Sequence, residues 1–239
     1  MCKFFSLLSD GHGKITYFDA KLRRAIKAGE IKDNAGNPIT QPDSHSSIAA
    51  YYGLDEDKHN KWEYNPYTDV LEKDSMPVKD DTTCVHDALN ALDWRGIAGD
   101  VAAVRELLAA LRANKWMDGH GVLPDGVKMY DTWDDAWDAA QGSEWDEATR
   151  ASWDAALKVA QNAARDAARD ILMDIAKDAS QAPVMRAIWD AGQLLRCLSI
   201  VDLLPQEHLA HARKRMDVWF AGYGVAGDVN GVLYCYRRA

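Results

Sequence analysis

The stretch "GYGVAGDVNGVLYCY", residues 222–236, decides how the C-terminal part of this chain folds. Its glycines follow the G-x-G-x-x-G spacing of a dinucleotide-binding loop, which needs a strand before the glycines and a helix after them. Here the order is reversed, because residues 205–221 place apolar side chains at helical spacing ahead of the glycines. Asn230-Gly231 between two apolar β-forming segments is a strong hairpin signal. We therefore predict a helix that stops at Gly222, then a hairpin, and no nucleotide-binding fingerprint.

The composition predicts a globular protein in the cytoplasm of the cell that makes it. The chain has 239 residues, of which 47% are hydrophobic and 27% charged, and its net charge is −9. Its apolar runs are shorter than the roughly 18 residues that a membrane span needs. The opening "MCKFFSLLSDGHG" does not resemble a signal peptide, since Asp10 and two glycines follow the apolar run at once. The negative charge argues against general nucleic-acid binding, which usually relies on a basic face.

Metal and cofactor motifs are weak. The four cysteines form no C-x-x-C pair, which favours reduced thiols over a zinc site. His208 and His211 share a helix face, but no third metal ligand accompanies them. The phosphate-binding, zinc-protease and nucleophile-elbow motifs are all missing from the sequence. We therefore predict no metal, no cofactor and no assigned catalytic residue.

The chain divides by pattern into three parts and predicts an α+β fold. Residues 1–75 form an N-terminal α/β unit, with two strand-like runs around a glycine-rich turn and helices near 19–29 and 43–53. Residues 76–221 form a helical region, and residues 222–239 form the C-terminal hairpin. Both chain ends carry hairpin signals, and a hairpin that pairs with no further strand leaves its edges exposed. We therefore expect the C-terminal hairpin to join the N-terminal sheet.

Residues 131–180 are rich in Ala, Asp and Trp. The tryptophans Trp133, Trp137, Trp145 and Trp153 are spaced by multiples of four, which indicates a degenerate helical repeat. From Trp153 onward an unbroken stripe of small apolar residues favours close packing against another helix. We expect these tryptophans to pack in the core or between helices, rather than to form a stacking platform.

Two basic and aromatic clusters are the candidate ligand-binding residues. The first lies in the final helix and just after it, and its members are Arg213, Arg215, Trp219 and Tyr223. The second lies in "KHNKWEYNP", residues 58–66, and contributes His59 and Lys61, which strand alternation places on one face. His45, at a helix start, is the last candidate. A cation beside an aromatic ring suits an anionic nucleotide, whereas the alternative for the first cluster is a charged solvent face paired with the acidic helices.

Several segments together resemble a group of uncharacterised proteins from bacteriophages and prophages. The matching segments are "CKFFSLLSDGHGKITYFD", "PDSHSSIAAYYG", "KHNKWEYNP" and "KRMDVWFAGYGVAGDVNGVLYCY". Proteins of this group often carry W-D-x-x repeats in the middle. The resemblance covers residues 2–70, 131–180 and 213–236. It implies phage origin and no established activity, so no catalytic residue is carried over from it.

These observations lead to one leading hypothesis and two alternatives. We expect a non-enzymatic phage accessory protein of the anti-defence type, which binds and sequesters a small host molecule such as a nucleotide-derived immune signal. The first alternative is an enzyme with an unfamiliar site that uses His45 or His59. The second is a structural or assembly protein that forms homo-oligomers through its acidic Trp/Ala helices. A ligand-dependent rise in melting temperature favours binding, turnover favours the enzyme, and ligand-free oligomers favour assembly.

Overall fold

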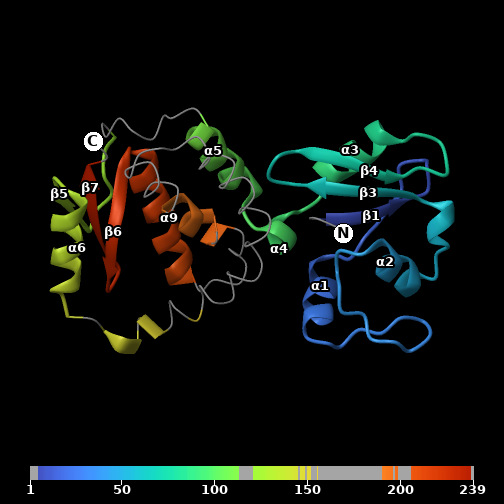
Figure 1. The fold of residues 1–239 in the computed structure, drawn as a ribbon, viewed down its shortest axis with the longest axis horizontal. Helices are drawn as coiled ribbons and strands as arrows, with labels where there is room; N and C mark the ends of the chain where they lie inside the picture. Colours follow the sequence, from blue (N-terminus) through green and yellow to red (C-terminus); the bar gives the residue numbers. More distant parts are fainter. Residues whose placement is uncertain are drawn as a thin grey trace. The chain divides into compact units, whose positions relative to one another are not determined.

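The computed structural model divides the chain into two compact units, Met1–Ala98 and Gly99–Ala239 (Figure 1). It describes residues 5–112, 121–144, 146–148, 150–151, 155, 190–195, 197–198 and 206–237. The predicted α+β class is confirmed, because each unit combines a sheet with helices. The boundary falls after residue 98 rather than after residue 75, since the helices that follow residue 75 belong to the first unit. None of the helices described combines the length and apolar character that a membrane crossing requires.

The N-terminal unit is built on a four-stranded antiparallel sheet in the order β2-β1-β3-β4. Its strands are β1 (Phe5–Ser9), β2 (Ile15–Thr16), β3 (Asn60–Asn65) and β4 (Val70–Ser75). The first two strands are the two runs predicted around the glycine-rich turn. Alternation along β3 sends Trp62 and Tyr64 to one face of the sheet and Lys61 and Glu63 to the other.

Helices cover both faces of this sheet (Figure 1). Helix α3 (Thr82–Asn90) lies on one face, and α1 (Ala20–Lys27) and α2 (His45–Tyr52) lie on the other. The short helices η1 (Glu56–Lys58) and α4 (Arg95–Ala98) complete the unit. The core on the α3 side consists of Phe5, Leu7, Trp62, Tyr64, Val85 and Leu89. The core on the α1 and α2 side consists of Leu8, Phe18, Ile26, Ile39, Ile48 and Ala49.

Local caps fix where α1 and α2 begin and end. The Asp19 carboxylate accepts a hydrogen bond from the backbone N–H of Leu22 at 2.8 Å. The Ser44 hydroxyl, just before α2, accepts one from the N–H of Ser47 at 3.3 Å. Gly53 ends α2 with a φ of 66°, a left-handed conformation that favours glycine. The two predicted helices are therefore confirmed.

The C-terminal unit has its own three-stranded sheet in the order β5-β7-β6. Strands β6 (Tyr223–Val229) and β7 (Val232–Arg237) form the predicted hairpin, and β5 (Val127–Tyr130) pairs with β7 in parallel. The prediction that this hairpin joins the N-terminal sheet is wrong. Instead, β5 pairs with the β7 side of the hairpin. On the other side, the backbone N–H of Val225 in β6 donates to the Asp190 carboxylate at 3.3 Å. A polar group at this edge of the sheet is therefore satisfied within the C-terminal unit.

The glycines of the 222–231 stretch serve the backbone. Helices α6 (Trp133–Gln141) and α9 (Gln206–Phe220) pack on opposite faces of the sheet, and α5 (Val101–Arg112) belongs to the same unit (Figure 1). Gly222 ends α9 with a φ of 90°, which confirms the predicted helix stop. A Cβ atom at Gly224 would overlap the ring of Tyr236, and one at Gly227 would overlap Ala140 of α6. The helix stop at Gly222 and the close packing at Gly224 and Gly227 thus account for the G-x-G-x-x-G spacing.

The hairpin turn has the geometry that its sequence predicts. Asn230 and Gly231 have φ angles of 53° and 78°, as a type I′ turn requires, between the paired residues Val229 and Val232. The Asn230 side chain also donates to the backbone oxygen of Glu144 and accepts from the N–H of Asp146, both at 2.9 Å. The turn therefore holds the segment that follows α6.

The tryptophans of the biased region are only partly described. Trp133 and Trp137 stack along α6 with ring centroids 5.2 Å apart and planes 11° apart. The prediction that they pack in the core or between helices is wrong for Trp137, which is 40% exposed. Residues four apart share one helix face, so the ring of Trp137 stacks on Trp133 and remains partly in solvent. Trp145, Trp153 and the small-residue stripe that begins at Trp153 fall outside the described residues.

Candidate ligand-binding site

Polar side chains gather on the α1 and α2 face of the N-terminal sheet. Lys61 and Glu63 project there from β3, and Ser6 of β1 stands directly opposite Glu63. His45, the first residue of α2, lies against Glu63. We call these residues the polar layer, together with the Arg23–Asp43 ion pair and Glu56, which binds Lys61. Its members are Ser6, Arg23, Asp43, His45, Glu56, Lys61 and Glu63.

His45 is held tightly within the polar layer. The residue is 6% exposed, and its imidazole Nε2 lies 3.1 Å from the backbone oxygen of Trp62. Because a carbonyl oxygen can only accept, Nε2 carries the proton of this bond. Nε2 also lies 3.6 Å from Oε1 of Glu63, and Nδ1 lies 3.5 Å from Oδ2 of Asp74 on β4. A carboxylate therefore stands near each ring nitrogen.

Glu63 and the Arg23–Asp43 pair make further bonds in the layer. The Ser6 hydroxyl donates to Oε1 of Glu63 at 2.8 Å. Nη2 of Arg23 on α1 donates to Oδ2 of Asp43, just before α2, at 2.7 Å. The Arg23 guanidinium carbon also lies 5.5 Å from the ring centroid of Phe5, the residue before Ser6. The ion pair therefore lies beside the end of β1 that carries Ser6.

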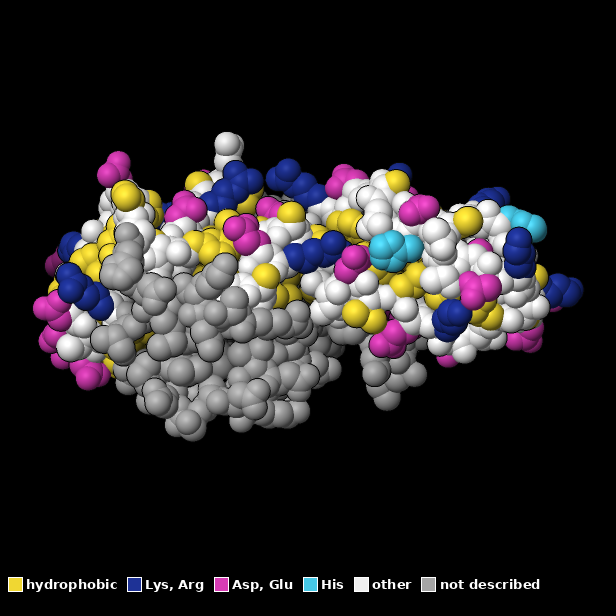
Figure 2. Space-filling view, turned by 90° about the horizontal axis from the view of Figure 1, so that it is seen from above, with side chains coloured by type: hydrophobic (Ala, Val, Ile, Leu, Met, Phe, Trp, Pro, Cys, Tyr) yellow, Lys and Arg dark blue, Asp and Glu magenta, His cyan; other side chains and the backbone are white. Residues whose placement is uncertain are grey.

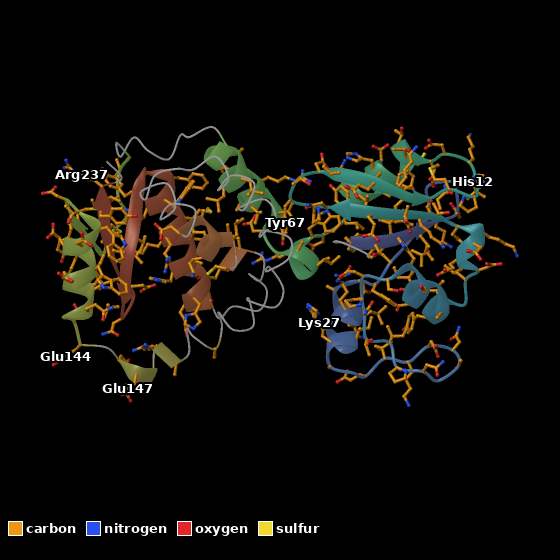
Figure 3. The ribbon with its side chains drawn as sticks, viewed as in Figure 1. His12, Lys27, Tyr67, Glu144, Glu147 and Arg237 are labelled. Carbon is orange, nitrogen blue, oxygen red and sulfur yellow. The ribbon has the colours of Figure 1, made fainter. Side chains whose placement is uncertain are left out.

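Lys27 follows Arg23 by one helical turn and extends from α1 (Figure 3). Partial burial lowers the pKa of Lys27, and the neighbouring charge of Arg23 lowers it further, while Asp43 acts in the opposite direction. A second cation thus stands near the Arg23–Asp43 pair.

Lys61 and His59, the second predicted cluster, are bound differently. The Lys61 ammonium donates to Oε1 of Glu56 at 3.3 Å and lies 3.6 Å from Oδ1 of Asp57. Burial lowers the pKa of Lys61, but the hydrogen bond to Glu56 and the charges of both carboxylates raise it overall. His59 precedes β3, and its Nδ1 lies 2.8 Å from the backbone oxygen of Asp55. Lys61 therefore belongs to the polar layer, whereas His59 belongs to the turn before it.

Four buried polar atoms of the layer have no hydrogen-bond partner among the described residues. They are Nη1 of Arg23, Oδ1 of Asp43, Oε2 of Glu56 and Oε2 of Glu63. A buried polar group without a partner costs about 1–3 kcal/mol, so such atoms usually meet water, an ion or a ligand. Three of the four accept hydrogen bonds and one donates. The polar atoms of the layer that lack partners are therefore mainly carboxylate oxygens.

The first predicted cluster lies in the C-terminal unit and is largely used by the fold. Nη1 of Arg215 lies 3.4 Å from Oδ2 of Asp228 on β6, and Nε2 of His211 binds the same oxygen. Trp219 is 1% exposed, and Tyr223 is half-buried against the core that includes Val218. Arg213 is exposed. A phosphate at Arg215 would therefore compete with Asp228.

The structure brings together some predicted residues and not others. His45 and Lys61 meet in the polar layer, and Arg215 meets His211, with which it was expected to share a helix face. The two predicted clusters lie in different units with separate sheets, so they do not meet through a shared sheet as the chain ends were expected to do. Sequence reasoning missed Ser6, Arg23, Glu56 and Glu63, and it assigned Asp43 only to the start of a helix. Glu63 alone carried a signal, since it follows Lys61 by two residues on the same strand face.

Charges of both signs are interspersed over the face of the molecule shown in Figure 2. Within the described ranges, no group of three or more His, Cys, Asp or Glu side chains is arranged to hold a metal ion. Comparison with protein-family models, curated proteins and solved structures gave no match to this chain.

Proposed function

We propose that the N-terminal unit binds and sequesters a small polar molecule in the polar layer, without turning it over. The observation that carries this proposal is the set of four buried atoms without partners, on Arg23, Asp43, Glu56 and Glu63. A ligand that supplies these hydrogen bonds would be stabilised by each of them, and charged partners strengthen such bonds.

A nucleotide-derived signal is the ligand class to test first. Ribose hydroxyls are donors that carboxylates accept in nucleotide-binding proteins, and the polar layer offers carboxylate oxygens on Asp43, Glu56 and Glu63. The free N–H of Arg23 suits a phosphate oxygen. The resemblance to phage proteins gives such a molecule a role, since removing a host immune signal would serve an anti-defence protein.

Calorimetric titration of the full chain with cyclic nucleotides and ADP-ribose derivatives tests the proposal. For a member that binds, Glu63→Gln and Arg23→Gln should each weaken binding by roughly ten- to a hundredfold, the effect of one hydrogen bond to a charged group. Glu30→Gln, an exposed carboxylate after α1, is the matched control and should leave the affinity unchanged. Melting temperatures measured without ligand separate lost binding from lost folding. An absence of heat with every member, or equal effects of Glu63→Gln and Glu30→Gln, would overturn the proposal.

The enzyme alternative has one observation in its favour, the contact between His45 and Glu63. A histidine beside a carboxylate is a common general acid–base arrangement. Chromatography of the titrated samples separates the two functions, because sequestration leaves the ligand intact whereas an enzyme converts it. Conversion that His45→Gln abolishes would favour the enzyme.

A further inference from the structure

Three polar side chains contact one another in the C-terminal unit. They are independent of the binding function proposed above for the N-terminal unit. Oη of Tyr234 on β7 lies 2.6 Å from the hydroxyl oxygen of Ser143 and accepts a hydrogen bond from Nζ of Lys128 at 3.1 Å. The parallel pairing of β5 with β7 sets Lys128 directly beside Tyr234. Helix α6 covers the same face of the sheet, and Ser143 follows its C-terminal end. The fold itself therefore assembles the three groups.

The surroundings of the Tyr234 phenol shift its pKa below the usual value of a tyrosine. The hydrogen bond shared with Ser143 and the one from Lys128 lower the pKa of Tyr234, and burial offsets this only in part. Nζ of Lys128 also lies 4.8 Å from the centroid of the Tyr234 ring. The ring of Tyr130 stacks on that of Tyr234, with centroids 6.2 Å apart and planes 12° apart. The phenol is thus held in place by a hydrogen bond, a stacked ring and a neighbouring cation.

We propose that Ser143, Tyr234 and Lys128 form a nucleophilic site for acyl transfer from small activated esters. Ser143 is the nucleophile, Tyr234 is its general base, and Lys128 positions and stabilises the phenolate. A nucleophile within hydrogen-bond reach of a base, with the base held by a third group, is the usual arrangement for covalent catalysis. Ser143 is half-buried and Lys128 exposed, whereas Tyr234 is 3% exposed, so the nucleophile is more accessible than its base.

The reaction balances with water as the second substrate. Oγ of Ser143 attacks the ester carbonyl carbon while its proton passes to the phenolate of Tyr234. The tetrahedral intermediate then breaks its bond to the leaving oxygen, which takes the proton from Tyr234 and departs as an alcohol. Water attacks the acyl-serine with Tyr234 again as base, which releases the carboxylic acid and restores Ser143.

The resting geometry shows which rotation the serine must make. The Ser143 hydroxyl also donates to the backbone oxygen of Ala139 at 2.9 Å. It has one proton, so donation to Ala139 leaves its oxygen to accept from the neutral phenol. Once the phenol is ionised, rotation about the Cβ–Oγ bond of Ser143 turns the proton toward Tyr234.

The test is covalent labelling of the full chain with a fluorophosphonate, located by peptide mass spectrometry, together with hydrolysis of p-nitrophenyl acetate over a pH series. We expect the adduct on Ser143, its loss in Ser143→Ala, and its retention in the control Ser75→Ala, which changes an exposed serine of the other unit. Tyr234→Phe should slow hydrolysis by roughly a hundredfold or more, as loss of a general base does.

Lys128 supplies a test that does not depend on a buried substitution. Because Lys128 is exposed, Lys128→Met should fold normally, which its melting temperature checks. Without the cation the phenol should ionise at higher pH, so the pH–rate profile should move upward, and Lys128→Arg should restore it. A wild-type protein with no adduct on Ser143, or a Lys128→Met profile identical to that of the wild type, would overturn the proposal.

Discussion

At the scale of single residues, Asp228 is a largely buried carboxylate that is stabilised by neighbouring basic side chains. Its side chain is 18% exposed and extends from β6 to His211 and Arg215 of α9. Burial raises the pKa of Asp228, but the hydrogen bond with His211 and the charge of Arg215 lower it overall. A depressed pKa in the folded state means that the carboxylate stabilises the fold above its unfolded-state pKa of about 3.9. This contribution is lost as the pH falls through the lower folded-state pKa.

Asp228→Asn should therefore reduce stability at pH 7 and weaken its dependence on acid. Loss of a buried, bonded carboxylate should lower the free energy of unfolding by about 1–3 kcal/mol at neutral pH. Between pH 5 and pH 2 the variant should lose less stability than the wild type, because it has no carboxylate to protonate there. Urea unfolding across this range measures both effects, with Asp125→Asn, an exposed aspartate of the same unit, as control. Parallel acid profiles for the wild type and Asp228→Asn would contradict the assignment.

At the scale of elements, the contact between α6 and β6 depends on one glycine. A Cβ atom at Gly227 would overlap the Cβ atom of Ala140, so Gly227→Ala should push the helix from the sheet. Overpacking of this kind costs about 1–3 kcal/mol. Ala140→Gly in the same chain should recover part of that loss, which a double-mutant cycle measured by chemical unfolding would show as a favourable coupling.

Gly142 supplies the matched control for this prediction. It follows α6 with a φ of −75°, and an added Cβ atom would meet only ordinary contacts of 3.4 Å or more. Gly142→Ala should therefore change stability by less than about 0.5 kcal/mol. A neutral Gly227→Ala, or a double variant no more stable than Gly227→Ala, would show that the close approach is not tight.

Local signals predicted individual elements well, because the residues that decide them are neighbours in the chain. Asp19, Gly53, Gly222 and the Asn230-Gly231 turn all act where their sequence context places them. The pairing of whole elements depends on distant segments. Strand β5 carries few strand signals, and its parallel partner lies about a hundred residues away, so the hairpin was assigned to the wrong sheet.

For the candidate sites too, single residues could be predicted from the sequence, whereas contacts between distant segments could not. His45 and Lys61 were identifiable as unusual residue types in suggestive places. Their partners Glu63 and Glu56, and the Ser6 hydroxyl opposite Glu63, depend on strand register and on a short helix, which alternation alone does not specify. Ser143 and Tyr234 are 91 residues apart and carry no shared motif, so only the fold reveals their contact.

At the scale of the whole molecule, each of the two units has its own sheet and its own hydrophobic core clusters. The N-terminal sheet is sealed by α1, α2 and α3, and the C-terminal sheet by α6 and α9. Among the described residues, each strand pairs only with strands of its own unit. Cooperative folding follows shared cores and shared sheets, so each unit should unfold as a unit of its own.

Removal of residues 225–239 should therefore disrupt the C-terminal unit and spare the N-terminal one. The deletion takes away β7 and most of β6, whereas β1 keeps both of its neighbours, β2 and β3. Amide hydrogen exchange read by mass spectrometry should show unchanged protection at β1 and β3 and lost protection at β5. Leu7→Ala in the full chain is the reciprocal control, since Leu7 is fully buried in the N-terminal core and its truncation should lower protection there alone. Should the deletion also remove protection at β1 and β3, the units would depend on each other for stability, and the separate sheets would not be separate folding units.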